Sequence, residues 1–197
     1  MKKSIKIIAS ILLLSLKTIA QTADIGACNS LILCDSGRVM ATGYNSYGEL
    51  GNGGIGNAAY EPQYVNLLTD IIAVQGGWLN ALALKNDGTV WAWGSNTYGQ
   101  IGDSTFNDNV LTPVQVHGPG NVGFLSNIKA ISAGVIHSLA LKNDSTVWAW
   151  GDNSFGELGD STNIARLVPI QVQGLTNVIA IAAGGGFSMA LKDDGTV

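Results

Sequence analysis

A segment that recurs along the chain constrains the fold more than any other feature. The sequence NDGTVWAWG at residues 86–94 returns as NDSTVWAWG at residues 143–151, fifty-seven positions later. A weaker copy occupies residues 35–43, and a fourth begins at residue 193. Repetition at a fixed period of this length indicates structural units that stack on one another, because no single unit can bury its own apolar surface.

Two further elements recur with this segment in the same order. A loop of pattern Asn-x-x-Gly-x-x-Gly follows each copy, at residues 43–51, 94–102 and 151–159. An apolar segment ending in glycine precedes it, as at residues 71–77 and 128–134. Because glycine is costly inside helices and common in tight turns, the 26 glycines among 197 residues favour short strands over helices.

Each unit predicts about four strands. Residues 82–85 and 89–93 are short apolar runs joined by Asn-Asp-Gly, which suits a tight hairpin with positive φ. Residues 113–116 and 169–172 add a further strand that begins with proline. Four antiparallel strands make one blade of a β-propeller. We therefore predict an all-β chain of about 3.5 blades in an incomplete ring, with repeats at about 25–70, 71–127, 128–177 and 178–197.

Paired tryptophans are expected to hold the blades together. Trp91 and Trp93 lie in one hairpin, and Trp148 and Trp150 lie at the same positions in the next. Burying one tryptophan of 150 to 250 Å² at about 25 cal/mol per Å² contributes on the order of 4 to 6 kcal/mol. The two pairs are therefore predicted to dominate contacts between blades.

Residues 1–20 have the pattern of a secretory signal. Lys2, Lys3 and Lys6 precede the apolar residues 7–16, and a cleavage position falls before Gln21. The pattern predicts a secreted or cell-envelope protein with no membrane segment in its mature form; an uncleaved anchor or a buried helix is the alternative. Cleavage removes four of the ten basic residues and none of the fourteen acidic residues, which leaves a net charge of −8. Such a surface repels phosphate backbones, so we expect no nucleic-acid partner.

The repeats resemble those of the regulator of chromosome condensation family. The resemblance covers roughly residues 25–197 and rests on the Ala-Gly-x-x-His-Ser-x-Ala-Leu segment at 133–141, the Asp-Gly-x-Val hairpin and the Asn-x-x-Gly-x-x-Gly loop. It implies a seven-bladed propeller of about 350 residues, and residues 21–197 supply about half of that length. We expect the sequence to be a piece of a longer protein; two copies that complete one ring as a homodimer are the alternative.

Residue types that are catalytic or metal-binding in other proteins are better explained by structural roles in this sequence. Asn45, Asn96 and Asn153 fit turns that hydrogen-bond their own backbone. His137 aligns with asparagine or phenylalanine in the other repeats, which favours a structural role. The acidic residues around Gly156 do not reproduce a calcium-binding loop. No catalytic residue, metal or cofactor is expected.

The two cysteines are predicted to be free thiols; the alternative is that Cys34, which aligns with Lys85, pairs with a cysteine in an absent part of the chain. Cys28 and Cys34 are six residues apart in a segment that aligns with a strand. An extended segment of that length spans about 20 Å, whereas the Cα atoms of a disulfide lie within about 7 Å of each other.

Positions that differ between the repeats are candidates for partner binding, because blade packing does not dictate them. Trp78 occurs at a turn where the other repeats carry Ala27, Val135 and Gly185, although a core role is about equally plausible. An insertion near residues 117–125 presents aromatic and aliphatic side chains, and drift in a surface connection is its alternative. The candidate partner-binding residues are Trp78, Phe124, Leu125, His137 and Phe187.

These observations favour a secreted, non-enzymatic scaffold that binds an unidentified protein or glycan through its loop ends. The resemblance implies protein recognition: a nuclear member promotes nucleotide exchange on a small GTPase, and a secreted bacterial member inhibits β-lactamases. The alternative is an extracellular polysaccharide hydrolase or lyase at the propeller channel, which needs two carboxylates, or a histidine and an acid, converging from different blades. Asp70, Glu49 and Glu157 are available, but the two glutamates align with Gln100 in a repeated loop and so resemble structural residues.

Overall fold

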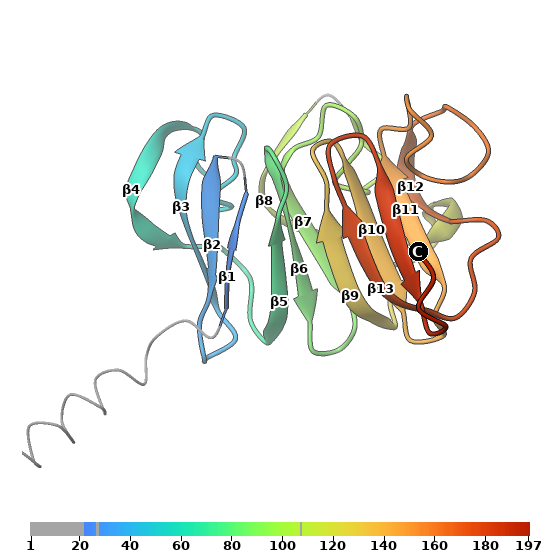
Figure 1. Ribbon diagram of the computed structural model, residues 1–197. Coiled ribbons are helices and arrows are strands. Elements are labelled where there is room, and N and C mark those ends of the chain that lie inside the picture. Colours follow the sequence, from blue (N-terminus) through green and yellow to red (C-terminus); the bar gives the residue numbers. More distant parts are fainter. Residues whose placement is uncertain (1–21, 27, 107) are drawn as a thin grey trace, which may run out of the picture.

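The protein is an array of antiparallel β-sheets, as the repeats predict. The computed structural model describes residues 22–26, 28–106 and 108–197, so the predicted signal at residues 1–20 lies outside the described residues. Three sheets have four strands each and a fourth has two (Figure 1). The described residues contain one short 3-10 helix, Pro119–Asn121, and none of their helices is long and apolar enough to cross a membrane.

The strands follow one another across each sheet in sequence order. Blade 1 contains β1 (Thr22–Ile25), β2 (Asn29–Leu33), β3 (Val39–Asn45) and β4 (Gly56–Tyr64). Blade 2 contains β5 (Ile71–Gly76), β6 (Asn80–Lys85), β7 (Val90–Ser95) and β8 (Asn109–Gln115). Blade 3 contains β9 (Ile128–Ala133), β10 (His137–Lys142), β11 (Val147–Gly151) and β12 (Arg166–Gln171). Blade 4 contains β13 (Val178–Ala183) and β14 (Ser188–Lys192), and the ring is not closed.

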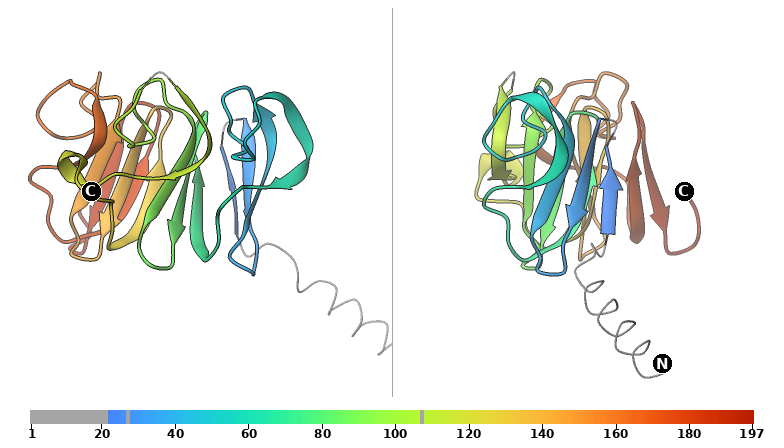
Figure 2. Two further views of the ribbon diagram at one scale, coloured as in Figure 1. Left: turned by 180° about the vertical axis from the view of Figure 1, so that it is seen from behind. Right: turned by 90° about the vertical axis from the view of Figure 1, so that its left-hand side faces the viewer.

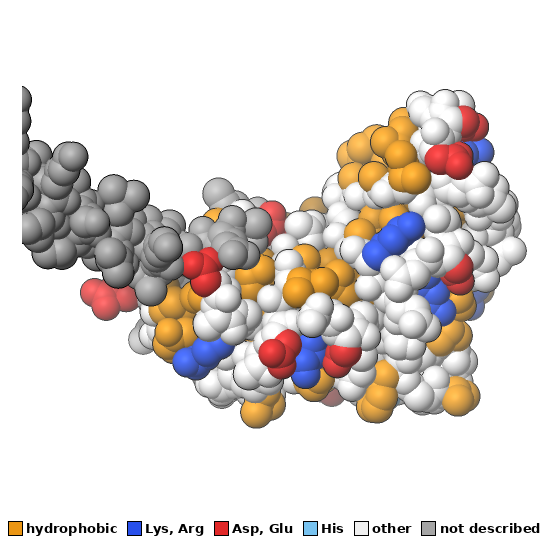
Figure 3. All heavy atoms as spheres, turned by 90° about the horizontal axis from the view of Figure 1, so that it is seen from below, with side chains coloured by type: hydrophobic (Ala, Val, Ile, Leu, Met, Phe, Trp, Pro, Cys, Tyr) orange, Lys and Arg blue, Asp and Glu red, His pale blue; other side chains and the backbone are white. Residues whose placement is uncertain are grey.

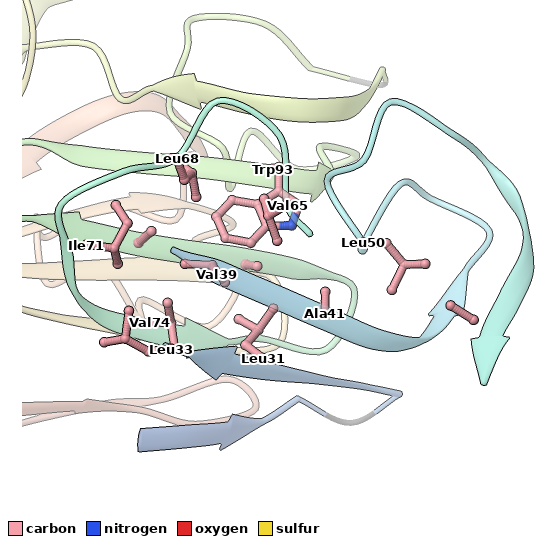
Figure 4. Packing of buried hydrophobic residues seen from close by; sticks show 13 residues of the cluster. Leu31, Leu33, Val39, Ala41, Leu50, Val65, Leu68, Ile71, Val74 and Trp93 are labelled. Carbon is pink, nitrogen blue, oxygen red and sulfur yellow. The ribbon is translucent and has the colours of Figure 1, made fainter. Parts of the chain in front are cut away.

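The blades stand side by side (Figures 1 and 2). Buried apolar side chains of neighbouring blades pack against each other. The first strand of each blade contacts the first strand of the next, which defines the inner side of the arc. The core is divided into layers between blades. Figure 4 shows the first layer, where Leu31, Val39 and Ala41 of blade 1 meet Val74 and Trp93 of blade 2. Each blade is therefore stable only against a neighbour, as expected for a sheet with two apolar faces.

The predicted Asn-Asp-Gly hairpin is confirmed. Gly88 has φ +80°, and Asp87 Oδ1 accepts hydrogen bonds from the backbone N–H and the hydroxyl of Thr89 at 3.0 and 2.6 Å. Ser145 occupies the same place in blade 3 with φ +65°, a left-handed conformation that disfavours a side chain.

Ser145→Gly is expected to stabilise the protein by about 0.5 kcal/mol. Relief of the left-handed strain exceeds the extra entropy that glycine gains in the unfolded chain, although a 3.2 Å hydrogen bond from Lys129 Nζ is lost. Urea unfolding of both proteins measures the change. The reciprocal variant, Gly88→Ser, should lose a similar amount, and equal midpoints for all three proteins would contradict the expectation.

The predicted position of the prolines at the strand start is wrong. Pro113 lies inside β8 and Pro169 inside β12. Both prolines lie opposite a shift in the pairing register. In blade 2 the shift falls between Ala92 and Gly94 of β7, and in blade 3 it falls between Ala149 and Gly151 of β11. Proline has no backbone N–H to donate, and an outermost strand tolerates it at such an irregularity because no ladder hydrogen bond is needed at that position.

The two-stranded fourth blade leaves an apolar hollow of about 550 Å³ against blade 3, lined in part by Leu139, Val172, Phe187 and Met189. Between the complete blades, a tryptophan of the third strand fills the equivalent space.

The prediction that Cys28 and Cys34 do not form a disulfide with each other is confirmed. Cys28 is exposed and Cys34 is half-buried, and the two residues flank opposite ends of β2 without forming a disulfide.

Candidate functional site

The two ends of the strands form different surfaces. The loop face carries the turns after β5, β9 and β13 and the longer loops after β3, β7 and β11. The hairpin face carries the Asp-Gly type turns after β2, β6, β10 and β14. Because β-strands of one blade alternate in direction, every blade presents the same elements to the same face, and the repeats place equivalent residues in a row.

The loops of the loop face are held in shape by their own asparagines. Asn96 Oδ1 accepts a hydrogen bond from the backbone N–H of Ile101 at 3.1 Å, and its Nδ2 donates to Asp103 Oδ1 at 3.2 Å. Asn45 and Asn153 make the same backbone contact in their loops. The prediction that these residues form turns is confirmed, and the loops are ordered supports for neighbouring side chains.

Each of these loops also reaches over the following blade. The carbonyl oxygen of Glu49 accepts a hydrogen bond from Trp93 Nε1 at 2.9 Å, and the N–H of Gly53 donates to the carbonyl of Leu111 at 2.9 Å. Gln100 and Trp150 repeat the first contact one blade later, also at 2.9 Å. The loop face is therefore built from pairs of adjacent blades.

Exposed aromatic side chains gather on the loop face. Trp78 is 48% exposed, and Tyr44 and Tyr47 are 40% and 36% exposed with ring centroids 6.5 Å apart. Tyr98 and Phe155 hold the position of Tyr47 in the next two loops and are exposed as well. Large exposed aromatic side chains are enriched in binding surfaces. We call Tyr44, Tyr47 and Trp78 the loop-face aromatic residues.

Most basic side chains of the described residues lie on the hairpin face and not on the loop face. The basic residues of the hairpin face lie beside acidic turn residues, and blue and red side chains are interspersed there (Figure 3); they are Arg38, Lys85, Lys129, Lys142 and Lys192. The remaining basic side chain of the described residues is Arg166, whose guanidinium pairs with Asp160. Burial opposes ionisation of Asp160, but hydrogen bonds from Thr162 and Arg166 lower its pKa to about 2. Within the described residues, the loop face offers no unpaired cation.

His137 is an interior residue with a structural environment. Its Nε2 lies 3.0 Å from Ser188 Oγ, and the Ser188 hydroxyl donates to the carbonyl of Glu157 at 2.8 Å. The serine proton is thus directed to a carbonyl, and His137 acts as the donor to the hydroxyl oxygen. This arrangement does not activate Ser188 as a nucleophile.

The structure separates the five predicted binding residues. Leu125 and His137 are 1% and 0% exposed, so the expectation that they contact a partner is corrected: Leu125 belongs to the core between blades 2 and 3. Phe124 is exposed, but it lies in the connection that leaves the hairpin end of blade 2. Trp78 and Phe187 lie on the loop face. Tyr47 and Tyr98 were missed because recurring residues were interpreted as structural.

The environment of His137 predicts sensitivity to acid. Burial lowers the pKa of His137 below its usual 6.5, and the negative charges of Glu157 and Asp152 offset this only in part. Below pH 6.5 the unfolded chain binds a proton that the folded chain resists, so stability falls as the pH decreases, by up to about 1.4 kcal/mol per pH unit. His137→Asn, which introduces the residue found at Asn29 and Asn80, should flatten this slope between pH 7.5 and 5. Identical slopes in urea unfolding would contradict the assignment.

Together, the stacked four-stranded blades and the loops that bridge them define a β-propeller repeat protein. Residues 87–141 and 144–191 match the regulator of chromosome condensation (RCC1) repeat, and a second model of that description matches residues 71–100 and 128–157. The matches cover more than half of the chain, and the chain belongs to the RCC1 repeat family.

Several characterised proteins are similar in sequence. The chain is 34% identical over 155 residues to the probable E3 ubiquitin-protein ligase HERC6 of Homo sapiens, 31% over 141 residues to the ultraviolet-B receptor UVR8 of Arabidopsis thaliana, and 30% over 144 residues to the regulator of chromosome condensation of Mus musculus. These alignments cover 78%, 71% and 71% of the chain but 14%, 31% and 32% of the relatives. The chain therefore spans at most about a third of these relatives.

The fold is also similar to solved structures. Yeast RCC1 (Prp20) in complex with Kap60 aligns with a TM-score of 0.77 and 25% identity over 91% of the chain and 43% of that protein. Human WBSCR16 aligns with a TM-score of 0.54 and 20% identity over 88% of the chain and 58% of that protein, which supports the fold alone. The prediction of propeller blades is confirmed.

Proposed function

We propose that the protein is an exported, non-enzymatic propeller scaffold that binds a protein or glycan partner through the loop face. The observation that carries this proposal is the contrast between the two faces: one exposes aromatic side chains without an unpaired cation, and the other exposes interspersed charges. Aromatic side chains on ordered loops supply contact area at a low entropic cost, which suits recognition.

The positions of the carboxylates weigh against the alternative of a polysaccharide hydrolase or lyase. Glu49 Oε2 accepts a hydrogen bond from the backbone N–H of Tyr47 at 2.8 Å, and Glu157 Oε2 accepts one from Phe155 at 2.8 Å. Both glutamates are buried in their own turns, and Asp70 lies among the hairpin-face residues Cys34, Asp35 and Gly37. These three acids do not flank one substrate position, as glycoside hydrolysis requires.

Similar proteins support a binding role. Solved structures describe yeast RCC1 bound to Kap60, and its binding to Gsp1p and histones. HERC6 is named a probable ubiquitin ligase, but the chain covers only 14% of it. The predicted mature charge of −8 disfavours nucleic acid, and a binding scaffold accounts for the loop face without a catalytic group.

Export and binding can be tested separately. Mature protein recovered from the culture medium or cell envelope should begin at Gln21, and protein retained in the cytosol with an intact Met1 would contradict export. For binding, the double variant Tyr47→Ser/Tyr98→Ser should lose saturable binding to extracellular components. A matched hairpin-face variant, Lys85→Ser/Lys142→Ser, should retain it. Equal binding by both variants would contradict a role for the loop face.

A further inference from the structure

The apolar hollow between blades 3 and 4 continues the series of contacts between blades. Its volume is about 550 Å³, and its lining comes mainly from the loop after β11, the segment after β12 and strand β14. In the two preceding contacts, the equivalent space holds the indole of Trp93 or Trp150. The hollow is therefore compared below with a space that an indole fills.

A glycine and a valine shape this space in successive blades. A Cβ added at Gly102 would lie 2.8 Å from Trp150 Cδ1 and 3.0 Å from Val116 Cγ1. At Gly159, which lines the hollow, the added Cβ would lie 2.8 Å from Val172 Cγ1, with no other atom of the described residues within 4 Å. The hollow thus keeps the glycine and the valine that contact an indole in the preceding blade.

The backbone of the hollow also offers an acceptor for an indole N–H. The carbonyl oxygen of Gln100 accepts hydrogen bonds from Ser138 Oγ at 3.0 Å and from Trp150 Nε1 at 2.9 Å. The equivalent carbonyl of Glu157 accepts one from Ser188 Oγ at 2.8 Å, and no second donor occurs among the described residues. Because a carbonyl oxygen has two lone pairs, it can accept a second hydrogen bond where Trp150 donates in the preceding blade.

One edge of β14 is open to a further strand. β14 pairs with β13 along one edge and, within the described residues, with no strand along the other. Its equivalents β6 and β10 pair there with β7 and β11, which carry the pattern Trp-x-Trp-Gly. An unpaired edge is a template for strand addition. Since Ser138 lies opposite Trp150 in blade 3, a strand added in this register places its second tryptophan opposite Ser188, beside the carbonyl of Glu157.

We infer that the hollow binds a tryptophan-bearing β-strand of another polypeptide, with the pattern Trp-x-Trp-Gly. The strand pairs with the edge of β14, its second indole fills the hollow, and the indole N–H donates to the carbonyl of Glu157. A second folded copy cannot supply this strand, because β7 and β11 are each enclosed between two strands of their own sheet. The site lies between blades, so it goes beyond the proposed function of the loop face.

Fluorescence anisotropy of a labelled peptide titrated with the 197-residue chain tests the inference. The peptide acetyl-Trp-Ala-Trp-Gly-Ser-Asn copies residues 91–96 and should bind saturably. Replacing its second tryptophan by alanine should weaken binding about tenfold or more, since a central tryptophan typically dominates binding. Replacing its first tryptophan should cost less, because Trp91 is only half-buried in blade 2.

Two further probes separate the hydrogen bond from the strand pairing. Benzothienylalanine in place of the second tryptophan keeps the shape of the indole but removes its N–H, so it should weaken binding about two- to tenfold. N-acetyltryptophanamide supplies the indole without a strand and should compete about tenfold or more weakly than the peptide.

Two variants of the chain locate the site. Val172 is half-buried in the lining, so Val172→Trp fills the hollow from within and should abolish peptide binding. Gln171 is exposed and outside the lining, and Gln171→Trp, the matched control, should bind like the wild type. Circular dichroism checks that both variants fold. If Val172→Trp does not fold, the peptide series still decides, because it uses the unaltered chain.

The outcomes are distinct. Saturable binding that requires the second tryptophan and is blocked only by Val172→Trp supports the strand site. Absence of saturable binding, equal binding by both tryptophan replacements in the peptide, or equal binding by the two chain variants would overturn it. A dimer of the chain that the peptide does not dissociate would place a second copy in the hollow and also overturn it. Binding by the 197-residue chain but not by protein purified from its natural source would assign the hollow to a segment of the same polypeptide, against a separate partner.

Discussion

Replacing Trp93 by alanine is expected to lower the free energy of unfolding by about 3–5 kcal/mol, the range typical of a buried tryptophan. Trp93 is fully buried between blades 1 and 2 (Figure 4). Its indole lies against Gly51, where an added Cβ would be 2.9 Å from Trp93 Cδ1, and its Nε1 donates to the carbonyl of Glu49. The substitution opens a cavity and removes the donor at the same time. Urea unfolding followed by circular dichroism measures the loss.

Two companion variants isolate the causes. Trp93→Phe keeps most of the apolar contact but leaves the buried carbonyl of Glu49 without its 2.9 Å donor, so it should lose about 1–3 kcal/mol. Trp91→Ala is the matched control, because Trp91 is half-buried and bonds only Thr89 of its own hairpin. It should cost clearly less than Trp93→Ala. Equal losses for the two alanine variants would show that the contact between blades has no special weight.

The sequence predicts the blades well but not the different roles of the two tryptophans. Residues two apart in a strand share a face, so the pattern assigns Trp91 and Trp93 to the same contact between blades. The structure separates them because the loop of the preceding blade covers Trp93 and leaves Trp91 partly open. That coverage is a contact between residues 44 positions apart, and a local pattern contains no information about it.

The candidate site illustrates a second limit of the sequence. Comparing repeats identifies positions that packing does not fix, and this correctly brings Trp78 forward as a surface aromatic. It fails for Leu125 and His137, because a residue that varies between blades can still be buried against a neighbour. It also passes over Tyr47, since a recurring aromatic residue resembles a core residue until the loop geometry is known. Exposure follows from how blades overlap, which no single repeat encodes.

Gly77→Ala is expected to destabilise the protein by about 1–3 kcal/mol through overpacking, although its backbone conformation is open to any residue. An added Cβ would lie 2.6 Å from the carbonyl oxygen of Gly134 in the next blade and 2.4 Å from Asn80 Oδ1 in its own blade. Gly26 and Gly134 make the same approach to the following blade, at 2.6 and 2.8 Å. Urea unfolding measures the loss, and Gly185→Ala, with no atom within 4 Å of the added Cβ, should be nearly neutral.

The double variant Gly77→Ala/Asn80→Ala, compared with Asn80→Ala alone, decides which contact matters. If the Asn80 side chain is the obstacle, truncating it removes the cost of the alanine at position 77. If the carbonyl of Gly134 is the obstacle, the cost persists, because a backbone group of the next blade cannot move aside without shifting that blade. We expect the cost to persist. The separation of the inner strands would then be set by backbone contact at a glycine in each of blades 1 to 3, so these glycines fix the curvature of the arc.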